Sequence, residues 1–241
     1  MFIATYSPVL LAQKWTTEMA VKVLKTAEEI RSLEKADISV DLKNVDSKRT
    51  VIYDLKILRS TEDRAYLEFL SPAEERGRKM LAKSRSYWST FPDSKRIVAI
   101  SRKEMIGNSA FALADIFQLD SEKDYTPEII AEEIKDGVKL YKLSLKAKHE
   151  DTPYGSIIYW VEVQGYFPNR AQFYGISGKH IKTMTIDTRK QIAGRLRPEV
   201  TRMVDEVTKG HVSWWKTKRM EPADIPDHVF SKEYLKNNHS L

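Results

Sequence analysis

The stretch YLEFLSPAEERGRKMLAKSRSYWSTFPDSKRIVAISRKEMIGNSAFALADIFQLD, residues 66–120, decides the fold of this chain. Short runs that suit an extended backbone alternate in it with Pro, Gly and Ser, a pattern typical of consecutive β-hairpins. The stretch ends in an apolar cluster whose spacing is compatible with a helix. The members of this cluster are Phe111, Leu113, Ile116 and Phe117. The pattern predicts hairpins that lead into a helix lying over the sheet.

Strand patterns continue on both sides of this stretch. Apolar and polar residues alternate over 38–43 and again over 51–57, as in antiparallel strands that face a core on one side and water on the other. Further runs bounded by turn residues are 156–164, 170–174, 179–187, 200–206 and 211–219. We expect about eleven strands in one sheet that curls on itself. The last segment, 224–235, is expected to form an ordered tail that caps the sheet.

The strongest hairpin signal is Asp136-Gly137, between the runs 128–135 and 138–148. Both residue types tolerate the positive φ angles that a two-residue hairpin turn requires. The sequence therefore predicts that these two runs pair as adjacent antiparallel strands.

Residues 15–35 carry the clearest helix pattern. Thr16 is a suitable N-cap, and Glu18 then lies in the first turn, where the helix dipole favours an acidic residue. One face is apolar, and its members are Trp15, Met19, Val23, Leu24, Ala27 and Ile30. Such a face can bind a membrane surface or pack on a sheet, and we expect packing on the sheet.

Composition excludes several classes of function. The chain has 241 residues and no cysteine, so disulfides, thiol catalysis and cysteine-ligated clusters are absent. The net charge of +6 permits an anionic partner, but 34 acidic residues are interspersed with 40 basic ones, which is typical of a mixed solvated surface. Residues 1–12 are apolar and interrupted by Pro8; they read either as the remnant of a secretory signal or as an ordinary tail.

The sequence contains no arrangement that predicts catalysis. The histidines lie far apart without a metal-ligand spacing, and Gly175-Ile176-Ser177-Gly178 fits a turn better than a nucleophile elbow. We therefore expect no catalytic residue, no bound metal and no cofactor.

A basic segment raises a nucleic-acid hypothesis. Basic residues interleaved with aromatic ones can line a groove for single strands, although Glu74, Glu75 and Asp93 bracket this segment. Its members are Arg76, Arg78, Lys79, Lys83, Arg85, Tyr87 and Trp88. A nucleic-acid partner is not our expectation, but it remains an alternative.

The order of motifs in the central stretch resembles a known family. The motifs are Phe69 with Ser71-Pro72, Gly77 with Met80-Leu81, Trp88 with Pro92, Lys95-Arg96, and Gly107-Asn108-Ser109 with Phe111 and Asp115-Ile116. This order resembles the LolA-like outer-membrane lipoprotein-sorting family, the LolA/LolB superfamily. Two departures are Thr90, where the family often has another aromatic pattern, and a spacing from Gly107 to Asp115 that is slightly long.

The resemblance extends beyond the central stretch. Further matching segments are 165–168, 178–182, 194–198, 203–205 and 225–230. Together the motifs cover about 36–235, and residues 15–35 take the position of the family's first helix.

The resemblance implies a fold, a location and a cargo. The fold is α+β and mainly antiparallel: an open, unclosed β half-barrel of about eleven strands, with a long N-terminal helix and short helices over its concave face. One domain would span 13–241, after 1–12 as a signal remnant or tail. Members of this family carry acyl chains across the periplasm of Gram-negative bacteria, between an inner-membrane transporter and an outer-membrane acceptor.

The resemblance also implies an apolar cavity and the side chains that form its wall and lid. These are Phe69, Met80, Trp88, Phe91, Phe111, Leu113 and Phe117. The implied function is a non-enzymatic carrier of lipid or lipoprotein acyl chains. The alternative is a non-enzymatic accessory subunit of a membrane export complex.

Overall fold

The computed structural model describes residues 15–60, 64–92, 94–117 and 121–237. Thirteen strands form one sheet in this part of the chain, rather than about eleven. Their bounds are β1 (Ala36–Val45), β2 (Thr50–Ser60), β3 (Arg64–Ser71), β4 (Lys79–Lys83), β5 (Ser86–Phe91), β6 (Ser94–Ile100), β7 (Tyr125–Lys135), β8 (Val138–Ala147), β9 (Ser156–Glu162), β10 (Pro168–Tyr174), β11 (His180–Ile192), β12 (Arg195–Asp205) and β13 (Val212–Pro222). The expected count was therefore too low.

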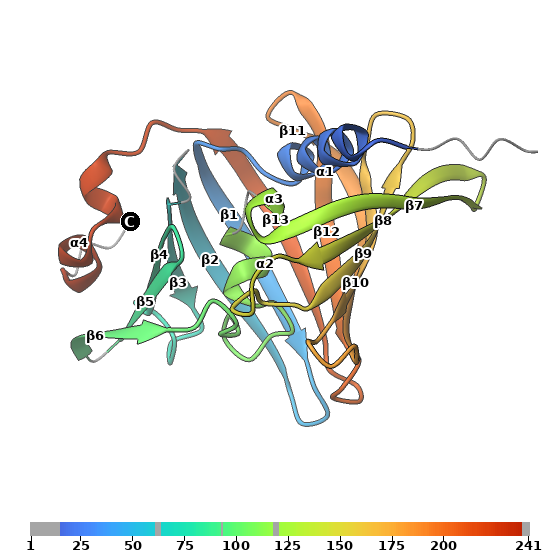
Figure 1. Ribbon diagram of the computed structural model, residues 1–241. Coiled ribbons are helices and arrows are strands. Elements are labelled where there is room, and N and C mark those ends of the chain that lie inside the picture. The colour runs from blue at the N-terminus through green and yellow to red at the C-terminus, as the bar shows by residue number, and fades with distance from the viewer. Residues whose placement is uncertain (1–14, 61–63, 93, 118–120, 238–241) are drawn as a thin grey trace, which may run out of the picture.

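The strand order explains how the sheet is built. It reads β6-β5-β4-β3-β2-β1-β13-β12-β11-β10-β9-β8-β7, and the pairings are antiparallel. Consecutive strands are sheet neighbours except β6 and β7, and the additional pairing of β1 with β13 joins the first and the last strand of the chain. The strongly curved sheet leaves β6 and β7 as edges (Figure 1). This architecture is consistent with an open half-barrel.

The connection between the two edges has to cross the sheet. β6 and β7 are consecutive in the chain but lie at opposite ends of the strand order. The described residues between them, 101–117 and 121–124, which we name the crossing segment, therefore pass over the concave face (Figure 1). The segment contains the short helices α2 (Leu113–Phe117) and α3 (Ser121–Asp124). Phe111 precedes α2 and is not helical, in contrast to the prediction.

Helix α1 (Thr17–Arg31) confirms the N-terminal helix and its N-cap. The Thr16 hydroxyl accepts a hydrogen bond from the backbone N–H of Met19 at 3.2 Å. The helix ends at Arg31 rather than at Lys35, because the Arg197 guanidinium donates to the terminal carbonyl groups of the helix and satisfies acceptors that have no intrahelical partner. The apolar face of α1 is buried against β7, β10 and β12, so α1 packs on the sheet as expected.

The predicted hairpin at Asp136-Gly137 is also confirmed. β7 and β8 pair antiparallel, with Lys135 opposite Val138. Asp136 and Gly137 have φ angles of 51° and 77°, the left-handed values that this turn requires.

The apolar residues form two clusters on opposite faces of the sheet. The main cluster lies on the concave face and includes residues of α1, the crossing segment and most strands. The outer cluster joins Leu58, Tyr66 and Leu81 to the tail, which contains η1 (Asp227–Phe230) and α4 (Lys232–Lys236). The tail is thus ordered, as predicted, and covers the outer face of the first strands. Residues 1–12, where a signal remnant was expected, lie outside the described part.

Candidate functional site

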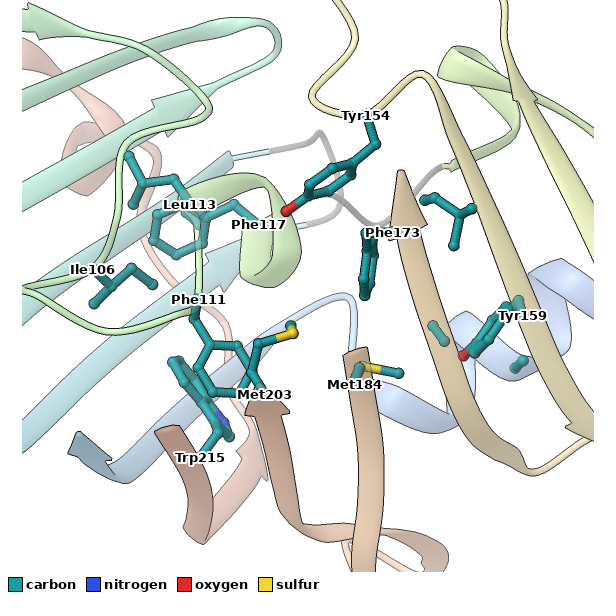
Figure 2. Close-up of a cluster of buried hydrophobic side chains, with 14 of the residues drawn as sticks. Ile106, Phe111, Leu113, Phe117, Tyr154, Tyr159, Phe173, Met184, Met203 and Trp215 are labelled. Carbon is teal, nitrogen blue, oxygen red and sulfur yellow. The ribbon is translucent and has the colours of Figure 1, made fainter. Parts of the chain in front are cut away.

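The concave face is lined by aromatic and sulfur-containing side chains. The Phe111 and Trp215 rings lie 5.8 Å apart between centroids, and those of Tyr154 and Phe173 lie 4.7 Å apart. Figure 2 shows Phe111 and Met203 close to Trp215, with Met184 on a neighbouring strand. Soft methionine and flat aromatic side chains suit a surface that adapts to irregular apolar ligands.

The structure brings together five of the side chains that the sequence assigned to the wall and lid. These five side chains belong to the main cluster and are each at most 4% exposed: Phe69, Met80, Phe111, Leu113 and Phe117. Phe69 and Met80 belong to the strands, whereas the other three belong to the crossing segment. These five residues therefore divide into two of the sheet and three of the crossing segment.

Trp88 and Phe91 lie apart from the other five. In β5, Tyr87 faces the main cluster, so its neighbour Trp88 points to the other face and packs against the outer cluster. Phe91 is 44% exposed, and the Arg78 guanidinium lies 5.1 Å from its ring centroid. A register shift between Ser89 and Phe91 interrupts the alternation there, so the period-two pattern does not determine the position of this strand end.

Other wall residues were not among the predicted set. They are Tyr53, Tyr159, Phe173, Met184, Met203 and Trp215. All except Tyr159, whose neighbour Trp160 is buried, lie on a strand between exposed or half-buried neighbours. That period-two pattern was available in the sequence, but it does not indicate which face of a strand is concave.

A small cavity lies where α1, α2 and the strands meet. It encloses about 70 Å³, whereas pockets for small molecules usually measure about 300–1,000 Å³. The apolar residues that line it are Ile38, Ile57, Phe111, Ile116, Pro198, Trp215 and Met220. Phe111 is thus the one predicted site residue that lines it. A cavity of this volume is too small for an acyl chain, so an acyl chain can enter only if some of the side chains on the concave face move away.

Guanidinium groups hold the end of α2 beside this cavity. Arg31 of α1 donates to the carbonyl oxygen of Asp115 at 3.0 Å. Arg59 of β2 donates to the carbonyl oxygen of Ile116 and to the Ser32 hydroxyl. Both arginines line the cavity together with the carboxylates of Glu28 and Asp115. A polar edge therefore borders the apolar wall.

Asp115 is the centre of a buried polar network. Its carboxylate accepts hydrogen bonds from the Tyr154 hydroxyl at 2.6 Å and from the backbone N–H of Ala112 at 2.8 Å. The Lys182 ammonium lies 3.3 Å from the same carboxylate and 3.2 Å from the Tyr154 hydroxyl. Burial raises the pKa of Tyr154 well above its usual value, and the Asp115 charge raises it further. Tyr154 therefore stays a proton donor at neutral pH.

The first half of the crossing segment is anchored to other strands. The Ala110 N–H donates to the Ser213 hydroxyl at 2.9 Å, and the Asn108 N–H donates to the Tyr53 hydroxyl at 3.3 Å. Gly107 has φ +59°, and a Cβ there would lie 2.7 Å from the Tyr53 ring. Glycine is therefore required at this close approach.

The described residues offer no arrangement for metal binding. They contain no group of three or more His, Asp or Glu side chains that could hold a metal ion. The Ser213 hydroxyl donates to the side-chain oxygen of Asn44 at 2.7 Å, so it is not paired with a base that would activate it. Within the same part of the chain, no helix is long and apolar enough to cross a bilayer.

Comparisons with known proteins agree with the geometry. Residues 61–237 match a protein family described as "Uncharacterized protein". No curated protein matches the chain. A LolA superfamily protein from Nitrosomonas europaea, NE2245, is similar to it with 27% identity and a TM-score of 0.82, over 90% of this chain and 99% of that one.

Two further solved structures share the fold. One is a domain from Vibrio parahaemolyticus that is named for outer membrane lipoprotein sorting, with 19% identity, a TM-score of 0.79 and coverage of 92% of this chain and 100% of the other. The second is a DUF1329 family protein from Desulfovibrio piger, with 17% identity, a TM-score of 0.81 and coverage of 91% and 98%.

Proposed function

The chain belongs to the LolA superfamily, and from this premise we propose that it is a carrier that binds acyl chains of lipids or lipoproteins on its concave face. The observation that carries the proposal is the crossing segment, whose apolar side chains occupy the middle of that face. In this hypothesis the segment fills the binding site of the empty carrier, and cargo displaces it. Residues 13–241 would act as one domain.

The energies of the two occupants are comparable. Ile106, Phe111, Leu113 and Phe117 of the crossing segment are at most 4% exposed, and burying four such side chains contributes about 6–12 kcal/mol. An acyl chain of about sixteen carbons contributes on the order of 10 kcal/mol at about 0.8 kcal/mol per methylene. Exchange of one for the other is therefore close to balanced, which suits a carrier that must both load and release.

The proposed carrier needs no catalytic group, because burial of apolar surface supplies the binding energy. We place it in the periplasm of a Gram-negative bacterium, where it would receive cargo from an inner-membrane transporter and deliver it to an outer-membrane acceptor. The filled concave face favours one second candidate, a non-enzymatic accessory subunit of a membrane export complex. That protein would bind the complex and ignore free lipid.

Displacement of a fluorescent fatty-acyl probe tests the carrier hypothesis. Wild-type protein is expected to bind the probe saturably, and Phe111→Ala is expected to bind it about tenfold more tightly, because the weakened crossing segment competes less well with the probe. Met203→Gln, which places an amide in the apolar wall, is expected to weaken binding about tenfold.

Phe91→Ala is the matched control, since this ring is 44% exposed and lies outside the main cluster, and its affinity should equal that of wild type. Thermal unfolding verifies that each variant is folded. Absence of saturable binding by the wild-type protein contradicts the carrier and leaves the accessory subunit.

A further inference from the structure

Three cationic side chains from three different elements converge on two consecutive residues of the crossing segment. Arg31 of α1 contacts the Asp115 carbonyl, and Arg59 of β2 contacts the Ile116 carbonyl. Lys182 of β11 contacts the Asp115 carboxylate at 3.3 Å. We name Arg31, Arg59 and Lys182 the cationic cluster. Its members are far apart in the chain, so only the folded sheet brings them to one place.

Stability does not explain this cluster. The Lys182 and Asp115 side chains are only 5% and 2% exposed. Removing both charges of such a pair from water costs several kcal/mol per ion, and a well-packed apolar pair often stabilises a protein as much or more. The fold could thus have used apolar residues here, as it does at Met184, two positions after Lys182 on the same face of β11.

Departure of the crossing segment would change the electrostatics of the site. The segment carries away the Asp115 carboxylate and both carbonyl oxygens, whereas the cationic cluster stays on α1 and the sheet. One acidic side chain, Glu28 of α1, also lines the cavity, and its carboxylate accepts from the Ser121 N–H at 3.1 Å. The emptied site is therefore positive beside an apolar wall that includes Ile57 and Trp215.

From this arrangement, we propose that the cationic cluster binds the anionic head group of the cargo, a carboxylate or a phosphate, while the acyl chain lies on the apolar wall. The inference rests on the proposed carrier function and adds the charge of its ligand. In the empty protein, Asp115 and the α2 carbonyl groups occupy the place of the head group. In the open state an anionic head group replaces the contacts that Asp115 and the carbonyl groups made with the cationic cluster. A neutral head group leaves the positive charges of the cluster without an anionic partner, so the anionic amphiphile binds more tightly.

A series of amphiphiles with one chain length and different head groups tests the proposal. Hexadecyl phosphate, hexadecanoate and hexadecanol compete for a fluorescent acyl probe on the full chain, and inorganic phosphate is added alone in a separate arm. Both anionic amphiphiles are expected to bind wild-type protein at least about tenfold more tightly than hexadecanol. Inorganic phosphate is expected not to displace the probe, because it lacks the apolar chain.

Two variants locate the preference. Arg31→Gln removes one cation, and Lys182→Gln combined with Asp115→Asn removes a buried pair without leaving one charge unpaired. Each is expected to reduce the preference for the anionic head group to within about threefold, with little effect on hexadecanol. Lys216→Gln is the matched control, because Lys216 is exposed on β13; it should keep the wild-type preference. Thermal unfolding again identifies variants that do not fold.

The outcomes separate this inference from the carrier function. If hexadecanol binds wild-type protein as tightly as the anionic amphiphiles, or if both variants keep the preference, the cationic cluster does not recognise the head group. The proposed carrier function is not contradicted by that result. If inorganic phosphate displaces the probe as well as hexadecyl phosphate does, the site takes small anions and the head-group inference is wrong. If no amphiphile binds at all, the carrier function and this inference fall together.

Discussion

At the scale of single residues, the polar side chains on the concave face carry the information about function. The inward positions of β2 run through Tyr53, Leu55 and Ile57 to Arg59, so a guanidinium stands where the pattern calls for an apolar residue. Lys182 interrupts the inward side of β11 in the same way. Buried charges are costly, and both are satisfied by the crossing segment. Buried charged residues that interrupt an apolar strand face therefore indicate the site better than the apolar residues around them.

Tyr159 allows a prediction about alkaline pH. Burial raises its pKa to about 12, while an unfolded tyrosine titrates near 10. The folded state then holds the proton longer than the unfolded state. The stability from this group is complete below about pH 10 and falls by about 1.4 kcal/mol per pH unit from there to the folded pKa. Urea unfolding from pH 8 to 11 is expected to show a shallower decline for Tyr159→Phe than for wild type.

The same variant should not lose stability at neutral pH. The Tyr159 hydroxyl is buried without a well-formed hydrogen bond, although the Arg31 guanidinium lies close enough to lower its pKa, so its removal is expected to change the free energy of unfolding by no more than about 1 kcal/mol. Tyr174→Phe is the control, because that hydroxyl donates to Gln172 at 3.2 Å on a half-buried side chain. Equal alkaline slopes for wild type and Tyr159→Phe would contradict the argument.

At the scale of elements, two segments outside the sheet cover its two faces. The crossing segment inserts apolar side chains and is held by Arg31, Arg59 and Lys182. The tail, by contrast, packs Phe230 and Leu235 against Tyr66 and Leu81 of the outer cluster. The tail also has polar contacts, because the Lys79 ammonium donates to the Asn237 carbonyl oxygen at 3.0 Å and Arg64 pairs with Asp227 at 3.2 Å. The two segments therefore differ in the face they cover: in the proposed carrier a ligand replaces the crossing segment, whereas the tail mainly stabilises.

A substitution in the tail should separate these two roles. Leu235→Ala removes a side chain that is 1% exposed and is expected to lower the free energy of unfolding by about 2–5 kcal/mol. It should leave the affinity for the acyl probe unchanged, because Leu235 lies on the face opposite to the site. Chemical denaturation and probe titration of the same sample measure both quantities. Lys236→Ala, an exposed neighbour, is the control, and altered probe affinity in Leu235→Ala alone would show that the faces are coupled.

At the scale of the whole molecule, the strand order creates the cover. Because β6 and β7 lie at opposite edges, the chain has to cross the concave face between them. The crossing segment is then tied to β13 through Ser213, to β2 through Arg59 and to β11 through Lys182. A ligand can load only after the crossing segment is released from β2, on one side of β13, and from β11, on the other side. Opening therefore involves strands across the whole sheet.

This geometry predicts slow, opening-limited loading. In stopped-flow mixing with a neutral acyl probe, the observed rate for wild-type protein is expected to reach a plateau at high probe concentration, because opening precedes binding. Arg59→Met removes charge-assisted contacts of about 1.5–3 kcal/mol and is expected to raise the plateau about tenfold. Arg49→Met, an exposed arginine between β1 and β2, should match wild type. A rate that rises linearly with probe concentration in wild type would exclude a closed resting state.

The sequence by itself determined the local elements. The apolar face and Thr16 cap of α1, the Asp136-Gly137 turn between β7 and β8, and the alternation along most strands were readable because each depends on residues close in the chain. Phe69, Met80, Phe111, Leu113 and Phe117 were named as wall and lid residues from the family resemblance, and the sequence did not determine which of them face inward.

Only the tertiary structure decided what these elements enclose. The pairing of β1 with β13, the placement of β6 and β7 at the edges, and the face on which Trp88 lies all depend on contacts between residues distant in the chain. Such pairings are set by the total free energy of the packed sheet, which no local pattern encodes. For the same reason the convergence of Arg31, Arg59 and Lys182 on the crossing segment became visible only in the folded chain.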